Sequence, residues 1–196
     1  MAMLSFTKIP SSGLMYRWTI MNAFLLALFA AGYVHGMLDL FIADDTYLTQ
    51  ALVVIFGAIL VHATMVALWF RKTWRYVEEF GLYYQTAKGE GRALEARDEI
   101  EEMLIRKLSL IEIAGPVLVA LGLMGTVLGI RIGFSELGPN IVGDLAASQL
   151  ALAKFMSGLG TAFNTTLVGI TGMVWNMLNL HMLKQEASRL YVSITA

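Results

Sequence analysis

The chain has 196 residues, of which 57% are hydrophobic and 15% are charged, and its formal net charge is −1 at pH 7. An ordinary soluble domain has about 25% charged residues, so this composition excludes a soluble globular protein and a disordered chain. The lack of a basic excess excludes a nucleic-acid-binding protein. There is no cysteine and only 3 histidines without a metal-binding motif, so we expect neither a bound metal nor a cofactor.

Four stretches contain no Asp, Glu, Lys or Arg and are long enough, or nearly so, to cross a bilayer. A membrane-spanning helix needs about 20 predominantly apolar residues. The four stretches are residues 18–38, 46–70, 113–130 and 155–183. The sequence therefore predicts an all-α, polytopic membrane protein with four transmembrane helices.

The charged residues define the domain organisation because most of them lie in one segment, between the second and third apolar stretches. We expect this segment to be exposed to water. The predicted regions are an N-terminal lead with the first two spans, a charged helical hairpin in the cytoplasm, the last two spans, and a cytoplasmic tail. Their boundaries are residues 1–70, 71–112, 113–183 and 184–196.

The distribution of basic residues predicts the orientation, because Lys and Arg favour cytoplasmic segments. If the N-terminus lies inside, every Lys and Arg except Arg131 and Lys154 also lies inside. The first outer loop then carries Asp39, Asp44 and Asp45 and no base. We therefore expect both termini in the cytoplasm. The first apolar stretch is too long for a cleavable signal sequence.

The charged segment predicts two helical arms that meet at the turn Gly89-Glu90-Gly91. The first arm is expected to continue the second span without a break, from Arg71 to about Ala87. In the second arm, apolar residues recur at helical spacing from Leu94 to Ile111. Each arm of about 20 residues would extend roughly 30 Å from the membrane. The apolar stripe favours packing against the other arm or a neighbouring subunit over ligand binding, and a plain solvated connection is the remaining alternative.

Small residues recur at helical spacing in both of the last two spans. They let helix backbones approach closely in lipid, so we predict that they form a packing face. In the fourth span the pattern continues through Thr165, Asn176 and Asn179. The predicted helix-packing residues are Gly125, Gly129, Gly133, Gly158, Ala162, Gly169 and Gly172.

Hydroxyl and amide side chains also lie within these two spans, where polar groups are costly unless they are paired or hydrated. They can bond to their own helix, or they can line a path for water and protons; the pattern leaves both open. No carboxylate or strong base lies in the middle of any span, so a titrating group would have to come from a partner. The polar residues in question are Thr126 in the third span and Ser157, Thr161, Asn164, Thr165, Thr166 and Thr171 in the fourth.

Two motifs carry a resemblance to a known family. Residues 121–130 read Leu-Gly-Leu-Met-Gly-Thr-Val-Leu-Gly-Ile, and residues 158–170 read Gly-Leu-Gly-Thr-Ala-Phe-Asn-Thr-Thr-Leu-Val-Gly-Ile. In their order, spacing and placement on the last two spans, they resemble the motifs of the MotA/TolQ/ExbB proton-channel family. The resemblance covers roughly residues 112–180.

This resemblance implies a stator subunit of an ion-driven motor in the bacterial inner membrane. Family members form a homo-pentameric ring around two copies of a single-span partner of the MotB/TolR/ExbD type, whose membrane aspartate takes up and releases the proton. The resemblance implies H⁺ as the transported ion, with Na⁺ as the alternative. By position, the resemblance assigns the ion path to Thr126 and Thr166, while Thr161 stands where relatives often carry a glutamate.

The pattern of small residues and the resemblance select different threonines in the fourth span. The small-residue pattern selects Thr165, and the family motif selects Thr166, which is about 100° further round the helix. We favour Thr166 as the residue that faces the ion path. The expected ion-path residues are Thr126, Thr166, Thr165, Thr161 and Asn164.

Other functions remain as alternatives to ion conduction. The principal rival is a non-conducting four-span scaffold or assembly protein, in which the small residues serve helix packing alone. A small transporter is less favoured, because the spans show no inverted repeat and no intramembrane ion pair. We expect no enzymatic activity and no catalytic residues, because the sequence shows no nucleophile–base pair and no phosphate-binding loop.

Overall fold

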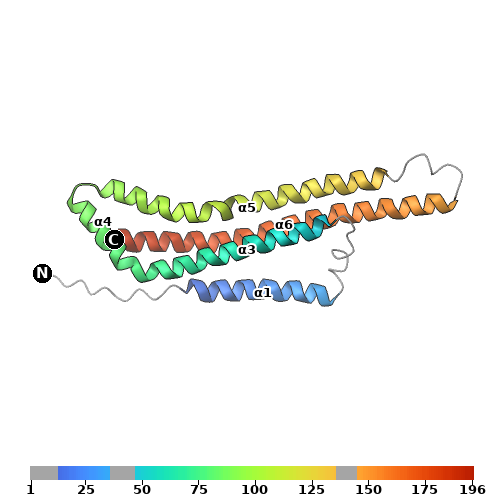
Figure 1. Ribbon diagram of the computed structural model, residues 1–196. Coiled ribbons are helices and arrows are strands. Elements are labelled where there is room, and N and C mark those ends of the chain that lie inside the picture. Colours follow the sequence, from blue (N-terminus) through green and yellow to red (C-terminus); the bar gives the residue numbers. More distant parts are fainter. Residues whose placement is uncertain (1–12, 36–46, 136–144) are drawn as a thin grey trace. The chain divides into compact units, whose positions relative to one another are not determined.

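The computed structural model describes residues 13–35, 47–135 and 145–196, and every regular element in these ranges is helical. The predicted all-α class is confirmed. The predicted outer loop with Asp39, Asp44 and Asp45 lies outside the described residues. The elements, drawn in Figure 1, are α1 (Leu14–Val34), α3 (Leu48–Thr73), the 3₁₀ turn η1 (Trp74–Tyr76), α4 (Val77–Gly89), α5 (Ala93–Ser135) and α6 (Leu145–Thr195).

Three of the described helical segments are long and apolar enough to cross a membrane: Leu14–Gly32, Leu48–Gly89 and Ala93–Ser135. They contain most of the first three predicted spans. Helix α6 is not among them because asparagine, threonine and glycine lower its hydropathy in the region of the predicted fourth span. Its 51 residues nevertheless make it about 76 Å long, compared with a hydrocarbon core of about 30 Å. The fourth span stays a prediction.

The helix that follows the second predicted span is interrupted, whereas the sequence predicted a continuous helix to about Ala87. Helix α3 ends at Thr73 and gives way to the turn η1 before α4 begins. At the end of this turn, Tyr76 has φ −108° and ψ 12°, which departs from helical geometry. Within the turn, Trp74 Nε1 donates a hydrogen bond to Glu186 Oε1 at 2.6 Å. This contact with α6 holds the chain at the point where α3 ends.

The turn between α4 and α5 lies at the glycines where the sequence predicted it. Helix α4 ends at Gly89 and α5 begins at Ala93. Between them, Gly91 has φ +80°, a left-handed conformation that glycine adopts without steric cost. The Arg92 N–H then donates to the carbonyl of Ala87 at 2.8 Å, which closes the turn.

The chain divides into two compact units, and α1, α3, α5 and α6 each contribute residues to both. Unit 1 contains residues 1–24, 61–112 and 178–196, and unit 2 contains residues 25–60 and 113–177. Unit 1 has a hydrophobic core, which includes the apolar stripe of the second predicted arm; the exception is Leu94, which is 74% exposed. The stripe therefore packs within the chain. The larger buried side chains of this core are Leu14, Trp18, Phe70, Tyr84, Ile100, Leu104, Leu108, Ile111, Leu183, Leu190 and Ile194.

The part of α1 that belongs to unit 1, residues 14–24, packs there through an apolar contact and an amide pair. Trp18 is buried in the core of the unit. One turn further along α1, Asn22 Nδ2 lies 3.0 Å from Asn179 Oδ1 on α6, and Asn179 is fully buried. Hydrogen bonds between polar side chains of membrane helices contribute about 0.6 kcal/mol each. The amide pair thus fixes which residues of α1 and α6 meet.

Candidate functional site

In unit 2, α5 and α6 lie so close together that only glycine fits at several positions. A Cβ atom added to Gly125 would lie 2.6 Å from Thr165 Cβ. On Gly129 it would lie 2.7 Å from the backbone nitrogen of Ala162, and on Gly158 it would lie 2.6 Å from the carbonyl oxygen of Gly129. Real Cβ atoms do not approach other atoms this closely. The two backbones are therefore in direct contact, and we call this region the glycine contact.

The glycine contact extends in both directions along the two helices. A Cβ atom on Gly133 would lie 3.0 Å from the carbonyl oxygen of Phe155, and one on Gly169 would lie 2.7 Å from that of Leu118. At Gly172 the neighbours are the side chains of Leu118 and of Phe56 on α3, at 3.2 and 3.3 Å. The structure thus places all seven predicted helix-packing residues at contacts within unit 2.

Two further glycines of α5 belong to this contact and were not among the predicted residues. A Cβ atom on Gly122 would lie 2.8 Å from the carbonyl oxygen of Thr165, and one on Gly115 would lie 3.3 Å from Asn176 Nδ2. Gly115, Gly122 and Gly129 are seven residues apart, so they share one face of the helix. This heptad spacing is the signal that could have identified them.

Thr126 of α5 and Thr166 of α6 join the two helices through a hydrogen bond between their hydroxyl groups. Thr126 Oγ1 also lies 3.1 Å from the carbonyl oxygens of Gly122 and Ala162. A hydroxyl group has only one hydrogen, so when Thr126 donates to a carbonyl, Thr166 donates to Thr126. Both side chains remain partly exposed. The oxygen of Thr166 therefore keeps a lone pair for a donor from outside the contact.

The neighbouring Thr165 has a different environment. Its side chain is fully buried against Gly125, and its hydroxyl lies 3.1 Å from the carbonyl oxygens of Thr161 and Ala162 on its own helix. Such a bond to the preceding turn is a common way for threonine to be satisfied within a helix. Thr165 is thus a packing residue, whereas the hydroxyl of Thr166 lies in a partly exposed pair.

The two remaining polar candidates on α6 do not share the face of Thr166. At 100° per residue, Asn164 lies about 200° and Thr161 about 140° away from Thr166 around the helix. Thr161 is 4% exposed and accepts the Thr165 hydroxyl through its backbone carbonyl. Asn164 is half-buried. The α5–α6 contact therefore brings together Thr126 and Thr166, with Thr165 buried beside them.

The charge near this site is low. In the described part of unit 2 there is no Asp or Glu, and the bases Arg131 and Lys154 are exposed. The described residues also include no cluster of side chains that could hold a metal ion. The described part of unit 2 therefore supplies no carboxylate to this site.

Comparisons with known proteins identify the family. No curated protein and no solved structure matches the chain. The sequence model of the MotA/TolQ/ExbB proton channel family matches residues 85–195, which include all of α5 and α6 with the glycine contact and the Thr126–Thr166 pair. The apolar helices together with this match identify the chain as a multi-pass membrane protein. The chain belongs to the MotA/TolQ/ExbB proton channel family.

Proposed function

We propose that the chain is the proton-conducting stator subunit of an ion-driven motor in the bacterial inner membrane. It couples ion flow to rotation or movement of a single-span partner of the MotB/TolR/ExbD type. The observation that carries this proposal is the hydrogen-bonded pair of Thr126 and Thr166. Hydroxyl groups both donate and accept hydrogen bonds, so a partly exposed pair can hold water and pass a proton along a helix surface.

We assign the titrating group in this mechanism to the partner, as the resemblance to the family implies; the described part of unit 2 supplies no carboxylate. Two copies of the partner each present a membrane aspartate to a homo-pentameric ring of this chain. When that aspartate is protonated, its O–H can donate to the free lone pair of Thr166. The ion is H⁺, with Na⁺ as the alternative. No catalytic residue and no enzymatic activity are part of this function.

The topology that we propose has four spans, with both termini in the cytoplasm and α6 forming the fourth span. Helix α5, with 43 residues, is about 65 Å long, and α6 is longer. A hydrocarbon core of about 30 Å cannot contain either helix. We therefore assign the charged parts of both helices, with α4, to the cytoplasm.

Substitution of the two threonines tests the proposal. We expect Thr126→Val and Thr166→Val, co-expressed with the partner, each to lower proton flux into vesicles about tenfold, the equivalent of one hydrogen bond of about 1.4 kcal/mol. Valine keeps the shape of threonine and removes the hydroxyl, and serine at either position should restore most of the flux. The matched control is Thr171→Val, because Thr171 is exposed on α6 and has no role in the proposed path.

The glycine contact by itself supports a second candidate, a non-conducting scaffold that uses the α5–α6 face for assembly alone. In a scaffold, the same threonine variants would change stability or nothing. If both valine variants assemble normally and conduct protons like the wild type and Thr171→Val, the conduction proposal is wrong. The scaffold function would then be the better account of the glycine contact.

A further inference from the structure

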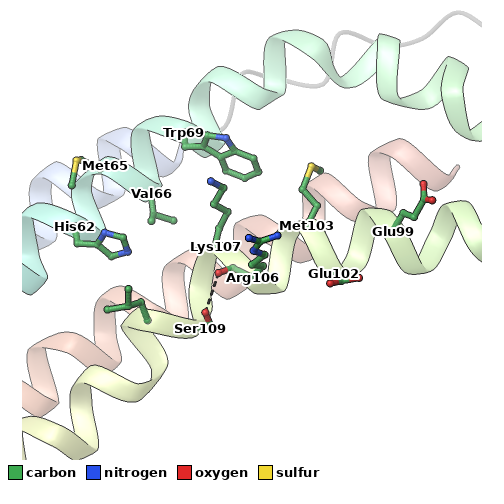
Figure 2. Close-up of a pocket in the computed structure, with 11 residues that line it drawn as sticks. His62, Met65, Val66, Trp69, Glu99, Glu102, Met103, Arg106, Lys107 and Ser109 are labelled. Atoms are coloured by element: carbon green, nitrogen blue, oxygen red, sulfur yellow. Dashed lines mark hydrogen bonds between the residues drawn. The ribbon is translucent and has the colours of Figure 1, made fainter.

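Unit 1 has an open groove of about 870 Å³ between α3 and α5. Figure 2 shows that Trp69 and His62 on α3 and Arg106 and Lys107 on α5 point into the space between the two helices. The groove begins within the apolar part of α3, whose charge-free stretch ends at Phe70, and it continues along the charged part of α5. It therefore lies at the transition from apolar to charged sequence on both helices.

The character of the groove changes in a fixed order along α5. At one end, Leu110 and Met65 are apolar and 62% and 55% exposed. The basic side chains of Arg106 and Lys107 follow, and the acidic side chain of Glu102 comes next. Leu110, Arg106 and Glu102 are four residues apart, which places them on one face of the helix at steps of about 6 Å.

The charges in the middle of the groove are available to a ligand. Among the described residues, neither Arg106 nor Lys107 takes part in an ion pair, and Lys107 Nζ lies 5.3 Å from the centre of the Trp69 ring. Glu99, at the far end, is occupied by a hydrogen bond from the hydroxyl of Tyr83, and this bond raises the pKa of Tyr83. Glu102 is therefore the carboxylate that remains to face a cation.

We propose that this groove binds a phospholipid with an amine headgroup, such as phosphatidylethanolamine. The acyl chain lies against Met65 and Leu110, the phosphate binds Arg106 and Lys107, and the ammonium group binds Glu102. Trp69 stands beside the phosphate, at the depth where indole rings prefer to lie in a membrane interface. This inference depends on the chain being a membrane protein and not on ion conduction.

The presence of an acid next to the two bases selects this lipid over an anionic one. Arginine and lysine both bind phosphate oxygens, so a phosphate of any phospholipid would satisfy them. The glycerol headgroup of phosphatidylglycerol is uncharged, so that lipid would leave Glu102 without a cation from the ligand. The ammonium group of phosphatidylethanolamine supplies that cation.

The test measures lipid bound to the full-length, delipidated protein in detergent by the mass of the intact assembly during titration. We expect phosphatidylethanolamine to bind about tenfold more tightly than phosphatidylglycerol. The double variant Arg106→Gln/Lys107→Gln should lose about tenfold or more in affinity for both lipids. Glu102→Gln should abolish the preference between them. Arg97→Gln and Asp98→Asn, both exposed on α5 outside the groove, are controls for the loss of a basic and of an acidic side chain and should behave like the wild type.

Two results would overturn the inference. In the first, the wild type binds both lipids equally, or the groove variants bind lipid as the controls do. In the second, the groove variants break up an oligomer while the lipid bound per subunit is unchanged, which would assign the groove to a contact with a second copy of the chain. The experiment measures lipid binding and does not depend on proton flux. Both results can therefore be interpreted even if the conduction proposal is wrong.

Discussion

Individual residues of unit 1 show how differently two acidic side chains contribute to stability. Glu186 is only 2% exposed and accepts a hydrogen bond from the indole of Trp74 at 2.6 Å. A buried carboxylate that loses such a donor is strongly destabilising. Glu112, in contrast, forms an ion pair with Lys184 in which both side chains are about half exposed, and exposed ion pairs contribute little.

We therefore expect Trp74→Phe to lower the free energy of unfolding by about 1.5–3 kcal/mol. Lys184→Met, which breaks the exposed ion pair in the same unit, should lower it by less than about 1 kcal/mol. Chemical denaturation of the detergent-purified protein, followed by circular dichroism, measures both values. Equal losses for the two variants would show that the indole does not stabilise the buried carboxylate.

The Trp74–Glu186 contact also shows why some local structure could not be predicted from the sequence. The residues from Arg71 to Ala87 favour a continuous helix, yet the structure has a 3₁₀ turn at Trp74–Tyr76. The partner of Trp74 is 112 residues away, so no local pattern reveals it. The amide pair of Asn22 and Asn179, 157 residues apart, escaped prediction for the same reason.

At the level of whole elements, the association of α5 with α6 depends on the glycine contact. Helical periodicity was sufficient to predict which face of each helix carries the small residues. It could not show that Thr165 fills the space opposite Gly125 while Thr166 meets Thr126, because that choice depends on the rotation of one helix against the other. Adjacent residues on a helix differ by about 100°, so a rotation of one helix through that angle would exchange their environments.

The glycine contact predicts opposite effects for two similar substitutions. Gly129→Ala should destabilise the protein by about 1–3 kcal/mol, because the added methyl group would meet the backbone of α6 and force the helices apart. Gly160→Ala should be neutral or stabilise it by up to about 1 kcal/mol, because nothing lies within 4 Å of that position and alanine favours helix. Thermal unfolding in detergent measures the pair. A lower Tm for Gly160→Ala than for Gly129→Ala would contradict the contact.

For the molecule as a whole, the family match covers the C-terminal helices and not the N-terminal ones. The matched residues 85–195 contain the glycine contact and the hydroxyl pair, whereas α1 and α3 lie outside the match. Unit 2 exposes many large apolar side chains, among them Val127, Phe163 and Leu167. Lipid and neighbouring subunits are the natural contacts for such a surface, and the ring that we propose would supply both.

The intact mass of the assembly tests this central claim most directly. The full chain is purified in detergent, alone and after co-expression with a single-span membrane protein encoded beside it, and is released into the gas phase by native mass spectrometry. Our account predicts five copies of the chain, and five copies with two of the partner after co-expression. A monomer or dimer that persists with the partner present would contradict it, and Thr126 and Thr166 would then be ordinary helix-packing residues.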